Sequence, residues 1–296
     1  MIYTVTFNPA IDYLMQIDSL TEGVTNRSLG ESFAFGGKGI NVSCVLSQLG
    51  VENTALGFVA GFTGNALEEH LKSKGIRTDF IKLDNGITRI NIKLKGNCET
   101  EINAQGPEIS KDAINDLFRK LDNIKSGDTL VLAGSVPNSL PKDIYEQILN
   151  RLSDKNIKFI VDATGNLLLN TLKYKPFLIK PNKQELEGVS GCRLNTDDDI
   201  ISAAKELQKL GAQNVLVSLG GDCSVLLDET GKIHRQKAYC GKVLNSVGAG
   251  DSMLAGFLCG IQKGYDYAFE LSLAAGSATA FSYDLATKEE IYNLLG

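Results

Sequence analysis

The chain has 296 residues, of which 43% are hydrophobic, and its formal net charge is −5. This length and composition suit one α/β domain with a sizeable core. The negative charge argues against a nucleic-acid or membrane-surface role. Two histidines and six cysteines without a C-x-x-C pair argue against a zinc site. We expect the cysteines to be buried as small hydrophobic residues and to remain reduced, as in the cytosol. We find no signal peptide or membrane-length apolar run, and we expect a cytoplasmic protein.

Strand-like and helical segments alternate along the chain. Predicted strands lie at 2–7, 54–59, 129–133, 157–161, 177–180 and 214–218. Predicted helices lie at 38–49, 64–74, 110–122, 141–152, 166–173, 197–210, 251–262, 265–282 and 287–295. Apolar strand runs such as Thr129-Leu130-Val131-Leu132-Ala133 suit a sheet that is buried on both faces. The alternation therefore predicts a parallel sheet covered by helices, in one main domain spanning 1–296.

Residues 88–104 break this pattern with a period of two. Positions 90, 92 and 94 are apolar, positions 89, 91 and 93 are polar, and Gly96-Asn97 marks a turn. The pattern predicts a hairpin, which the short segment from Asp12 to Ile17 can join. An isolated hairpin is marginally stable, and its apolar face needs cover. Either another part of the chain or a second subunit can supply that cover.

The run Asn245-Ser246-Val247-Gly248-Ala249-Gly250-Asp251-Ser252 precedes an apolar stretch. It predicts a turn that opens into a buried helix. The unpaired amides at a helix start form an anion site, and the glycines let a phosphate approach the backbone. An acid would repel a phosphate that is only held there, but it suits a general base beside a transferring phosphoryl group. By spacing alone, a glycine-rich turn with Asp251 as an ordinary N-cap fits equally well.

A second glycine-rich run precedes a helical pattern. Phe35-Gly36-Gly37-Lys38-Gly39-Ile40-Asn41-Val42 places three glycines around one lysine at a predicted helix start, and Asn41 one turn into the helix. This arrangement indicates backbone that is held open for a ligand, here with a cation. Lys38, Arg89 and Lys180 can supply the local positive charge that an anionic substrate needs.

Together these runs resemble the paired signatures of the ribokinase-like (PfkB) family of sugar kinases. Further motifs lie in the order that the family has them, over nearly the whole chain: Thr6-Phe7-Asn8-Pro9-Ala10-Ile11-Asp12, Thr88-Arg89-Ile90-Asn91, Glu99-Thr100-Glu101-Ile102-Asn103, Lys180-Pro181-Asn182-Lys183-Gln184-Glu185 and Ser218-Leu219-Gly220-Gly221. The resemblance implies a three-layer αβα fold with a mostly parallel central sheet. It also implies a small β-sheet lid, formed by segments at about 11–36 and 87–105, that often pairs with the lid of a second subunit.

The resemblance implies roles on the phosphoryl-acceptor side. Asp251 resembles the catalytic base, and Gly248, Ala249 and Gly250 resemble the anion hole. Lys38 and Arg89 resemble the clamp on the phosphate that the sugar already carries, a task that suits the arginine fork. Arg27 is either a third phosphate contact or a plain surface charge. Contacts to sugar hydroxyls are implied for Asp12, Gly37, Asn41 and Asn103.

The resemblance also implies a nucleotide side for ATP and Mg²⁺. Asn182 and Glu185 match an Asn-x-x-Glu motif that organises Mg²⁺, with Glu185 acting partly through water. An N-cap role for Asn182 is compatible with this one. The remaining nucleotide-binding residues implied are Lys180, Ser218, Gly220, Gly221, Cys223, Ser246, Val247, Gly250 and Ser277. Cys223 stands where the family often has glycine.

The expected activity is ATP-dependent phosphorylation of fructose 1-phosphate at its C6 hydroxyl, which gives fructose 1,6-bisphosphate and ADP. The alternatives are tagatose 6-phosphate as the acceptor and, from a different class, a non-catalytic regulator that binds a sugar phosphate. The chain lacks the Walker sequence G-x-x-x-x-G-K-[ST], as well as G-x-G-x-x-G and G-x-S-x-G. We expect a homodimer joined through the lid, although packing of the hairpin on its own domain would cover the apolar face equally well.

Overall fold

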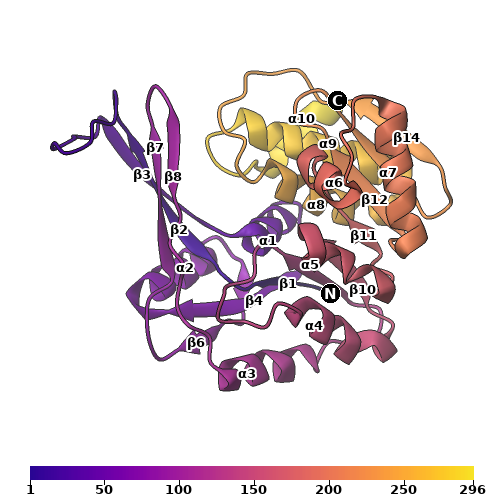
Figure 1. Cartoon of the computed structure of the whole chain (residues 1–296), viewed down its shortest axis with the longest axis horizontal. Coiled ribbons are helices and arrows are strands. Elements are labelled where there is room, and N and C mark those ends of the chain that lie inside the picture. The colour runs from indigo at the N-terminus through magenta and orange to yellow at the C-terminus, as the bar shows by residue number, and fades with distance from the viewer.

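The computed structural model describes residues 1–296. A ten-stranded sheet runs through the molecule in the order β14-β13-β12-β11-β10-β9-β1-β4-β5, with β6 paired to β4 (Figure 1). Its strands are β1 (Ile2–Thr6), β4 (Asn53–Ala60), β5 (Arg77–Thr78), β6 (Ile81–Leu83), β9 (Thr129–Ala133), β10 (Lys158–Asp162), β11 (Leu178–Ile179), β12 (Asn214–Ser218), β13 (Cys223–Leu227) and β14 (Ile233–Lys237). Only the pairs β12–β13 and β13–β14 are antiparallel, so the predicted mostly parallel sheet is confirmed.

Helices cover both faces of this sheet. One face carries α1 (Lys38–Gln48), α2 (Gly61–Ser73), α8 (Ala249–Gly260), α9 (Tyr265–Phe281) and α10 (Lys288–Leu295). The other carries α3 (Lys111–Leu121), α4 (Ile144–Leu152), α5 (Gly165–Leu169), α6 (Lys183–Ser190) and α7 (Asp197–Leu210). The α/β class and the three layers are as predicted. No helix combines the length and the apolar character needed to cross a membrane.

Strand β9 shows why the apolar runs form a central sheet. Its side chains alternate between the two hydrophobic cores, with Leu130 and Leu132 in one and Val131 and Ala133 in the other. All four are buried. A strand covered on both faces needs apolar residues at every position, which explains the unbroken run in the sequence.

A separate four-stranded sheet, in the order β3-β2-β7-β8, projects from the body (Figure 1). Its strands are β2 (Ala10–Gln16), β3 (Gly30–Gly36), β7 (Arg89–Lys95) and β8 (Glu99–Ile102). In the register, Tyr13 lies opposite both Phe33 and Ile92, and Ile92 lies opposite Ile102. Since side chains alternate along strands, these residues share one apolar face. We call this sheet the lid; its other face is polar and includes Asp12 and Asn91.

Some elements differ from the sequence prediction. Strands β3, β5, β6, β13 and β14 and helix α6 were not predicted as separate elements. The predicted helix at 166–173 is interrupted, and only α5 and a 3₁₀ turn at Leu172–Tyr174 form. Thr171 Oγ1 donates to the carbonyl of Leu168 at 2.6 Å, a local bond that competes with a continuous helix.

The prediction that the cysteines are buried holds fully only for Cys223, and Cys44 and Cys259 are half-buried. Cys98, Cys192 and Cys240 are exposed, while Cys223 is buried. The exposed three lie in connections between elements, where backbone and side chains face water. All six remain free thiols.

Candidate active site

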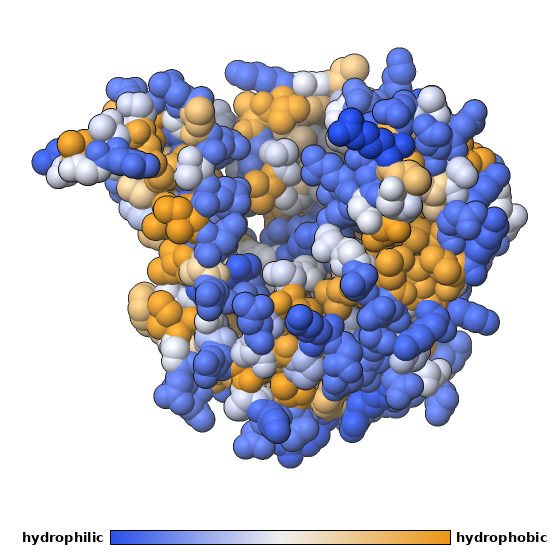
Figure 2. Space-filling model, viewed as in Figure 1, coloured by the Kyte–Doolittle hydropathy of each residue, from blue (hydrophilic) through white to orange (hydrophobic).

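A cavity of about 500 Å³ lies between the lid and the body of the molecule, and Figure 2 shows the corresponding hollow. It opens at the carboxyl ends of the parallel strands, where ligands bind in open α/β sheets. Two of its lining residues, Thr6 and Ser218, are the last residues of β1 and β12. Of the predicted site residues, the cavity is lined by Asp12, Gly37, Lys38, Asn41, Arg89, Lys180, Asn182, Glu185, Ser218, Val247, Gly248, Gly250 and Asp251.

Two helices begin at the cavity, each after a glycine. The N-cap of α1 is Gly37 with φ 137°, and the N-cap of α8 is Gly248 with φ 80°. Both angles lie in the region that disfavours side chains. Within the first turn of α8, the amides of Gly250 and Asp251 have no acceptor in the chain, whereas Ala249 N–H donates to Ser246 C=O at 3.3 Å. Two positive helix ends therefore face one cavity, as an anion site requires.

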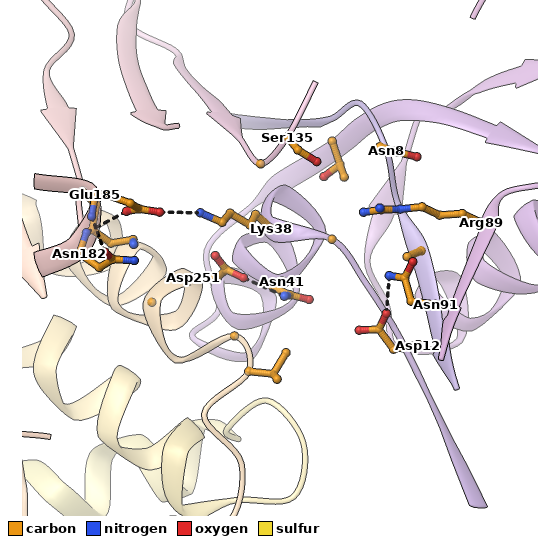
Figure 3. Close-up of a pocket in the computed structure, with 18 of the residues that line it drawn as sticks. Asn8, Asp12, Lys38, Asn41, Arg89, Asn91, Ser135, Asn182, Glu185 and Asp251 are labelled. Atoms are coloured by element: carbon orange, nitrogen blue, oxygen red, sulfur yellow. Dashed lines mark hydrogen bonds and ion pairs between the residues drawn. The ribbon is translucent and has the colours of Figure 1, made fainter. Parts of the chain in front are cut away.

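Asp251 lies in this first turn and is only 6% exposed. It does not cap the helix, because Gly248 holds the N-cap position. Its Oδ2 accepts a hydrogen bond from Asn41 Nδ2 of α1 at 2.8 Å (Figure 3). Burial and the nearby charge of Asp162 raise the pKa of Asp251 to about 6, although Lys180, Asn41 and Lys38 act in the opposite direction. The carboxylate is thus ionised at neutral pH and has more proton affinity than an ordinary aspartate.

The two lysines of the cavity converge on one buried acid. Lys38 Nζ lies 3.3 Å from Asp162 Oδ1 and 3.9 Å from Glu185 Oε1. Lys180 Nζ lies 3.5 Å from Asp162 Oδ2, and a Cβ placed on Gly250 would be 3.0 Å from that ammonium group. Lys38 therefore points toward Glu185 rather than toward Arg89, with which the sequence prediction grouped it (Figure 3).

Asn182 and Glu185 form a capping box at the start of α6. Asn182 Oδ1 accepts from Glu185 N–H and Glu185 Oε2 accepts from Asn182 N–H, both at 2.8 Å. An isolated bridge places Asn182 beside Ser218 at the end of β12. The box uses Oε2 of Glu185 and leaves Oε1 facing the ammonium group of Lys38.

The lid supplies the opposite wall. Arg89 Nη1 donates to the carbonyl of Ala104 at 3.3 Å, and its Nε is buried without a partner. Asn91 Nδ2 donates to Asp12 Oδ1 at 2.8 Å (Figure 3). Asn91 Oδ1 accepts from Ala104 N–H at 3.2 Å. Lys93 lies 3.7 Å from Asp12 Oδ2. The lid thus brings one acid and one arginine to the wall of the cavity.

Several predicted residues do not line this cavity. Arg27 is exposed on the loop between β2 and β3, and Asn103 is exposed just after β8. Cys223 is buried at the start of β13, and Ser277 Oγ accepts from Tyr239 N–H at 3.3 Å. The others outside its lining are Gly220, Gly221, Ser246 and Ala249.

Sequence reasoning missed some residues of the site. Thr6, Asn8, Ala10, Asn91, Gly134 and Ser135 line the cavity, and Asp162 lies buried beneath Lys38 and Lys180. A usable signal was present for Asp162, because an acid that directly follows Phe159-Ile160-Val161 marks the carboxyl end of a buried parallel strand. For Asn91 the signal was its position in the hairpin, because side chains at alternate positions share a face and Asn91 is two residues from Arg89.

The fold and cavity define an α/β enzyme with a lid, two helix N-termini at one cavity and a buried carboxylate. A comparison with protein families gives the particular assignment. Residues 5–289 match the family described as pfkB family carbohydrate kinase. The chain belongs to this family and is a carbohydrate kinase.

Relatives match along the entire chain. The protein named 1-phosphofructokinase of Bacillus subtilis (strain 168) is 43% identical, with 100% of this chain and 97% of the relative covered. A D-tagatose-1-phosphate kinase of Bacillus licheniformis is 40% identical, with 96% and 94% covered. The crystal structure of phosphofructokinase-2 from Escherichia coli with substrates and products superposes with a TM-score of 0.93 at 26% identity, covering 99% and 97% of the two chains.

Proposed function

We propose that the chain transfers the γ-phosphoryl group of ATP to the C6 hydroxyl of fructose 1-phosphate, giving fructose 1,6-bisphosphate and ADP. One observation carries the proposal: a buried carboxylate, Asp251, lies in the first turn of α8 beside two backbone amides that have no acceptor in the chain. A base and an anion site at one point are what phosphoryl transfer to an alcohol needs. The relatives named 1-phosphofructokinase support this choice of acceptor.

In the proposed mechanism, Asp251 accepts the proton of the C6 hydroxyl while that oxygen bonds to the γ-phosphorus. The bond between the γ-phosphorus and its bridging oxygen breaks, and ADP leaves. Amides around Gly248, Ala249 and Gly250 stabilise the charge on the transferring group, with Gly250 and Asp251 offering the unpaired donors. A pKa of about 6 suits a base that must be ionised yet proton-accepting near neutral pH.

The lid side of the cavity is the proposed sugar-phosphate site. Arg89 lines this side, and a guanidinium can bind a phosphate with two parallel bonds. Asp12, held by Asn91, binds a sugar hydroxyl, as do Gly37 and Asn41. Asn103 and Arg27 lie outside the cavity in this structure. They can contribute only if the lid moves or if a second subunit presents them.

The opposite side is the proposed nucleotide site. Lys180, Asn182 and Ser218 face the nucleotide phosphates. Gly220, Gly221 and Cys223 belong to the proposed nucleotide-side loop, and Ser246, Val247 and Ser277 to the proposed adenine region. Lys38 lies between the two half-sites, since its ammonium group points toward Glu185 while its backbone belongs to the glycine-rich run.

The residues present fit a water-mediated magnesium ion. No group of three or more His, Cys, Asp or Glu side chains could hold a metal directly. Glu185, whose side chain is 15% exposed, keeps Oε1 outside the capping box. Mg²⁺ retains several waters and is usually bound through one or two carboxylates and substrate phosphates. When bound, it would neutralise charge on the phosphate oxygens, with Glu185 as its anchor.

D-tagatose 1-phosphate is the second candidate acceptor. The Bacillus licheniformis relative named for it is 40% identical to this chain. Like fructose 1-phosphate, this sugar carries its phosphate at C1 and so presents the same C6 hydroxyl. The two acceptors differ only in the configuration at C4. Tagatose 6-phosphate, the alternative suggested by the sequence, would have to bind in the reverse orientation.

The test is ADP release by the purified protein with each of the three sugar phosphates, with Asp251→Asn as the control. We expect the highest kcat/KM with fructose 1-phosphate. A higher value with D-tagatose 1-phosphate would move the assignment to the second candidate. Binding of a sugar phosphate without ADP release would favour the non-catalytic regulator.

We also propose a homodimer that is joined through the apolar face of the lid and works in the cytoplasm. The lid face crosses all four strands, and the rings of Tyr13 and Phe33 stack with centroids 4.7 Å apart. Phe33 is 60% exposed and Ile102 57%. Because the lid projects from the body (Figure 1), a second lid is the most direct cover for these residues. Six free cysteines fit a reducing compartment.

A further inference from the structure

A carboxylate that the proposed mechanism has not yet used lies beneath the floor of the cavity. Asp162 is the last residue of β10, and its side chain is fully buried. Its Oδ1 accepts a hydrogen bond from Lys38 Nζ at 3.3 Å. Its Oδ2 lies 3.5 Å from Lys180 Nζ and has no hydrogen-bond partner. A buried carboxylate is costly unless it is paired, so both ammonium groups stabilise it.

The three charged groups come from three different elements. Lys38 begins α1, Asp162 ends β10, and Lys180 follows β11. The side chain of Lys180 is only 5% exposed, whereas that of Lys38 is 37% exposed toward the cavity. Without Asp162, two like charges near one buried point would repel each other and move apart. The positions of both lysines therefore depend on this one carboxylate.

We propose that Asp162 is a positioning residue for phosphoryl transfer, because its carboxylate fixes the ammonium groups of Lys38 and Lys180 and offsets their positive charge at Asp251. This inference rests on the proposed function of the same site. Asp162 itself is buried below the lysines, and its effect reaches the substrates through them.

The charges around Asp251 give this role a measurable consequence. After burial, the charge of Asp162 is the next cause that raises the pKa of Asp251, while Lys180, Asn41 and Lys38 act to lower it. Removing the Asp162 charge would leave the ammonium groups of Lys38 and Lys180 facing Asp251. Of these two, only Lys38 would still have a carboxylate partner, Glu185. The pKa of Asp251 would then fall, and the base would become weaker.

The test is Asp162→Asn, which keeps the shape and removes the charge. We expect kcat to fall at least tenfold, KM for ATP to rise about tenfold through misplaced lysines, and KM for the sugar phosphate to change less than threefold. The acidic limb of the kcat profile should move to lower pH by about one unit. Asp122→Asn is the matched control, because it removes one carboxylate from an exposed pair with Arg151 and should change none of these quantities.

A second variant separates charge from position. Asp162→Glu keeps the charge but displaces it by one methylene, so it should retain the acidic limb while raising KM for ATP. An unmoved acidic limb in Asp162→Asn would overturn the electrostatic role. A variant that changed only the Mg²⁺ concentration needed for half-maximal rate would make Asp162 a metal ligand instead.

A binding measurement keeps this inference separate from the proposed function. The dissociation constant of ATP, measured by calorimetry without any sugar, does not depend on which acceptor the enzyme uses. A weaker ATP complex in Asp162→Asn, with the thermal midpoint unchanged, supports the positioning role even if fructose 1-phosphate proves to be the wrong acceptor. An unchanged ATP complex would overturn it.

Discussion

At the scale of single residues, Asp251 is the residue on which the proposed reaction depends most. We expect Asp251→Asn to lower kcat by roughly 10² to 10⁴, the usual contribution of a positioned general base. Asn can still accept the hydrogen bond from Asn41, so ATP binding should change little. Steady-state kinetics together with ATP calorimetry check this result. A variant that kept most of its kcat would remove Asp251 from the mechanism.

The same substitution should stabilise the protein. The pKa of Asp251 is raised from 3.8 to about 6 in the folded state, so the ionised carboxylate costs stability at neutral pH, and this cost is lost as the pH falls through about 6. Asp251→Asn should therefore raise the free energy of unfolding at neutral pH by about 1–3 kcal/mol, with a smaller gain near pH 4. Urea titrations at the two pH values measure it. A gain that did not vary with pH would argue against a titrating origin.

Arg89 supports a prediction about the sugar phosphate. Its unpaired Nε is buried at the lid side of the cavity, away from Asn182 and Glu185. Arg89→Ala should weaken sugar-phosphate binding by about 1.5–3 kcal/mol, the value of a charge-assisted hydrogen bond, while KM for ATP stays nearly constant. Arg77→Ala is a control, since Arg77 is exposed on β5 and pairs only with exposed Glu52. A loss of ATP binding with an unchanged sugar KM would reverse the two half-sites.

At the scale of elements, the glycine start of α8 shapes the proposed anion site. Gly248 has φ 80°, and a Cβ there would lie 2.6 Å from Leu285 Cδ2. Gly248→Ala should therefore lower stability and also reduce kcat/KM at least tenfold by shifting the first-turn amides. Gly231→Ala is the matched control, because Gly231 has φ 87° and open space around its missing Cβ.

The control shares the backbone strain of Gly248→Ala, about 1–2 kcal/mol, but Gly231 does not line the cavity. Both variants should lose stability in urea titrations, and only Gly248→Ala should lose activity beyond the unfolded fraction. Equal kinetics in the two variants would show that the position of these amides does not limit the reaction.

At the scale of the whole molecule, the proposed dimer would make activity depend on assembly through the lid. Ile92 lies in the middle of the apolar lid face, opposite Tyr13 and Ile102. Ile92→Lys should lower both dimer content and activity, because a displaced lid cannot bring Arg89 to the sugar phosphate or exclude water. Ile233→Lys, at an exposed position on β14 of the body, is the control and should keep both.

Sedimentation at micromolar concentration measures the assembly directly. The expected wild-type species is a dimer of the 31.9 kDa chain. A fully active monomer would rule out a shared lid. The loss of activity in Ile92→Lys would then need an explanation within one chain.

The sequence by itself determined the class of the fold and identified many of the residues that line the cavity. Unbroken apolar runs such as 130–133 predicted a sheet buried on both faces, because only a doubly covered strand can hold apolar side chains at every position. The two glycine-rich runs predicted two helix starts, because glycine tolerates the backbone angles found at Gly37 and Gly248. These are local properties, so neighbouring residues suffice to reveal them.

Only the tertiary structure decided which charges meet. It directed Lys38 toward Asp162 and Glu185, both remote from it in the sequence, instead of toward Arg89. It also buried Asp251 among Asn41, Asp162 and Lys180, which sets its pKa. These contacts join the ends of strands and helices that are far apart along the chain. Their geometry follows from the strand order of the sheet, which no local pattern of residues encodes.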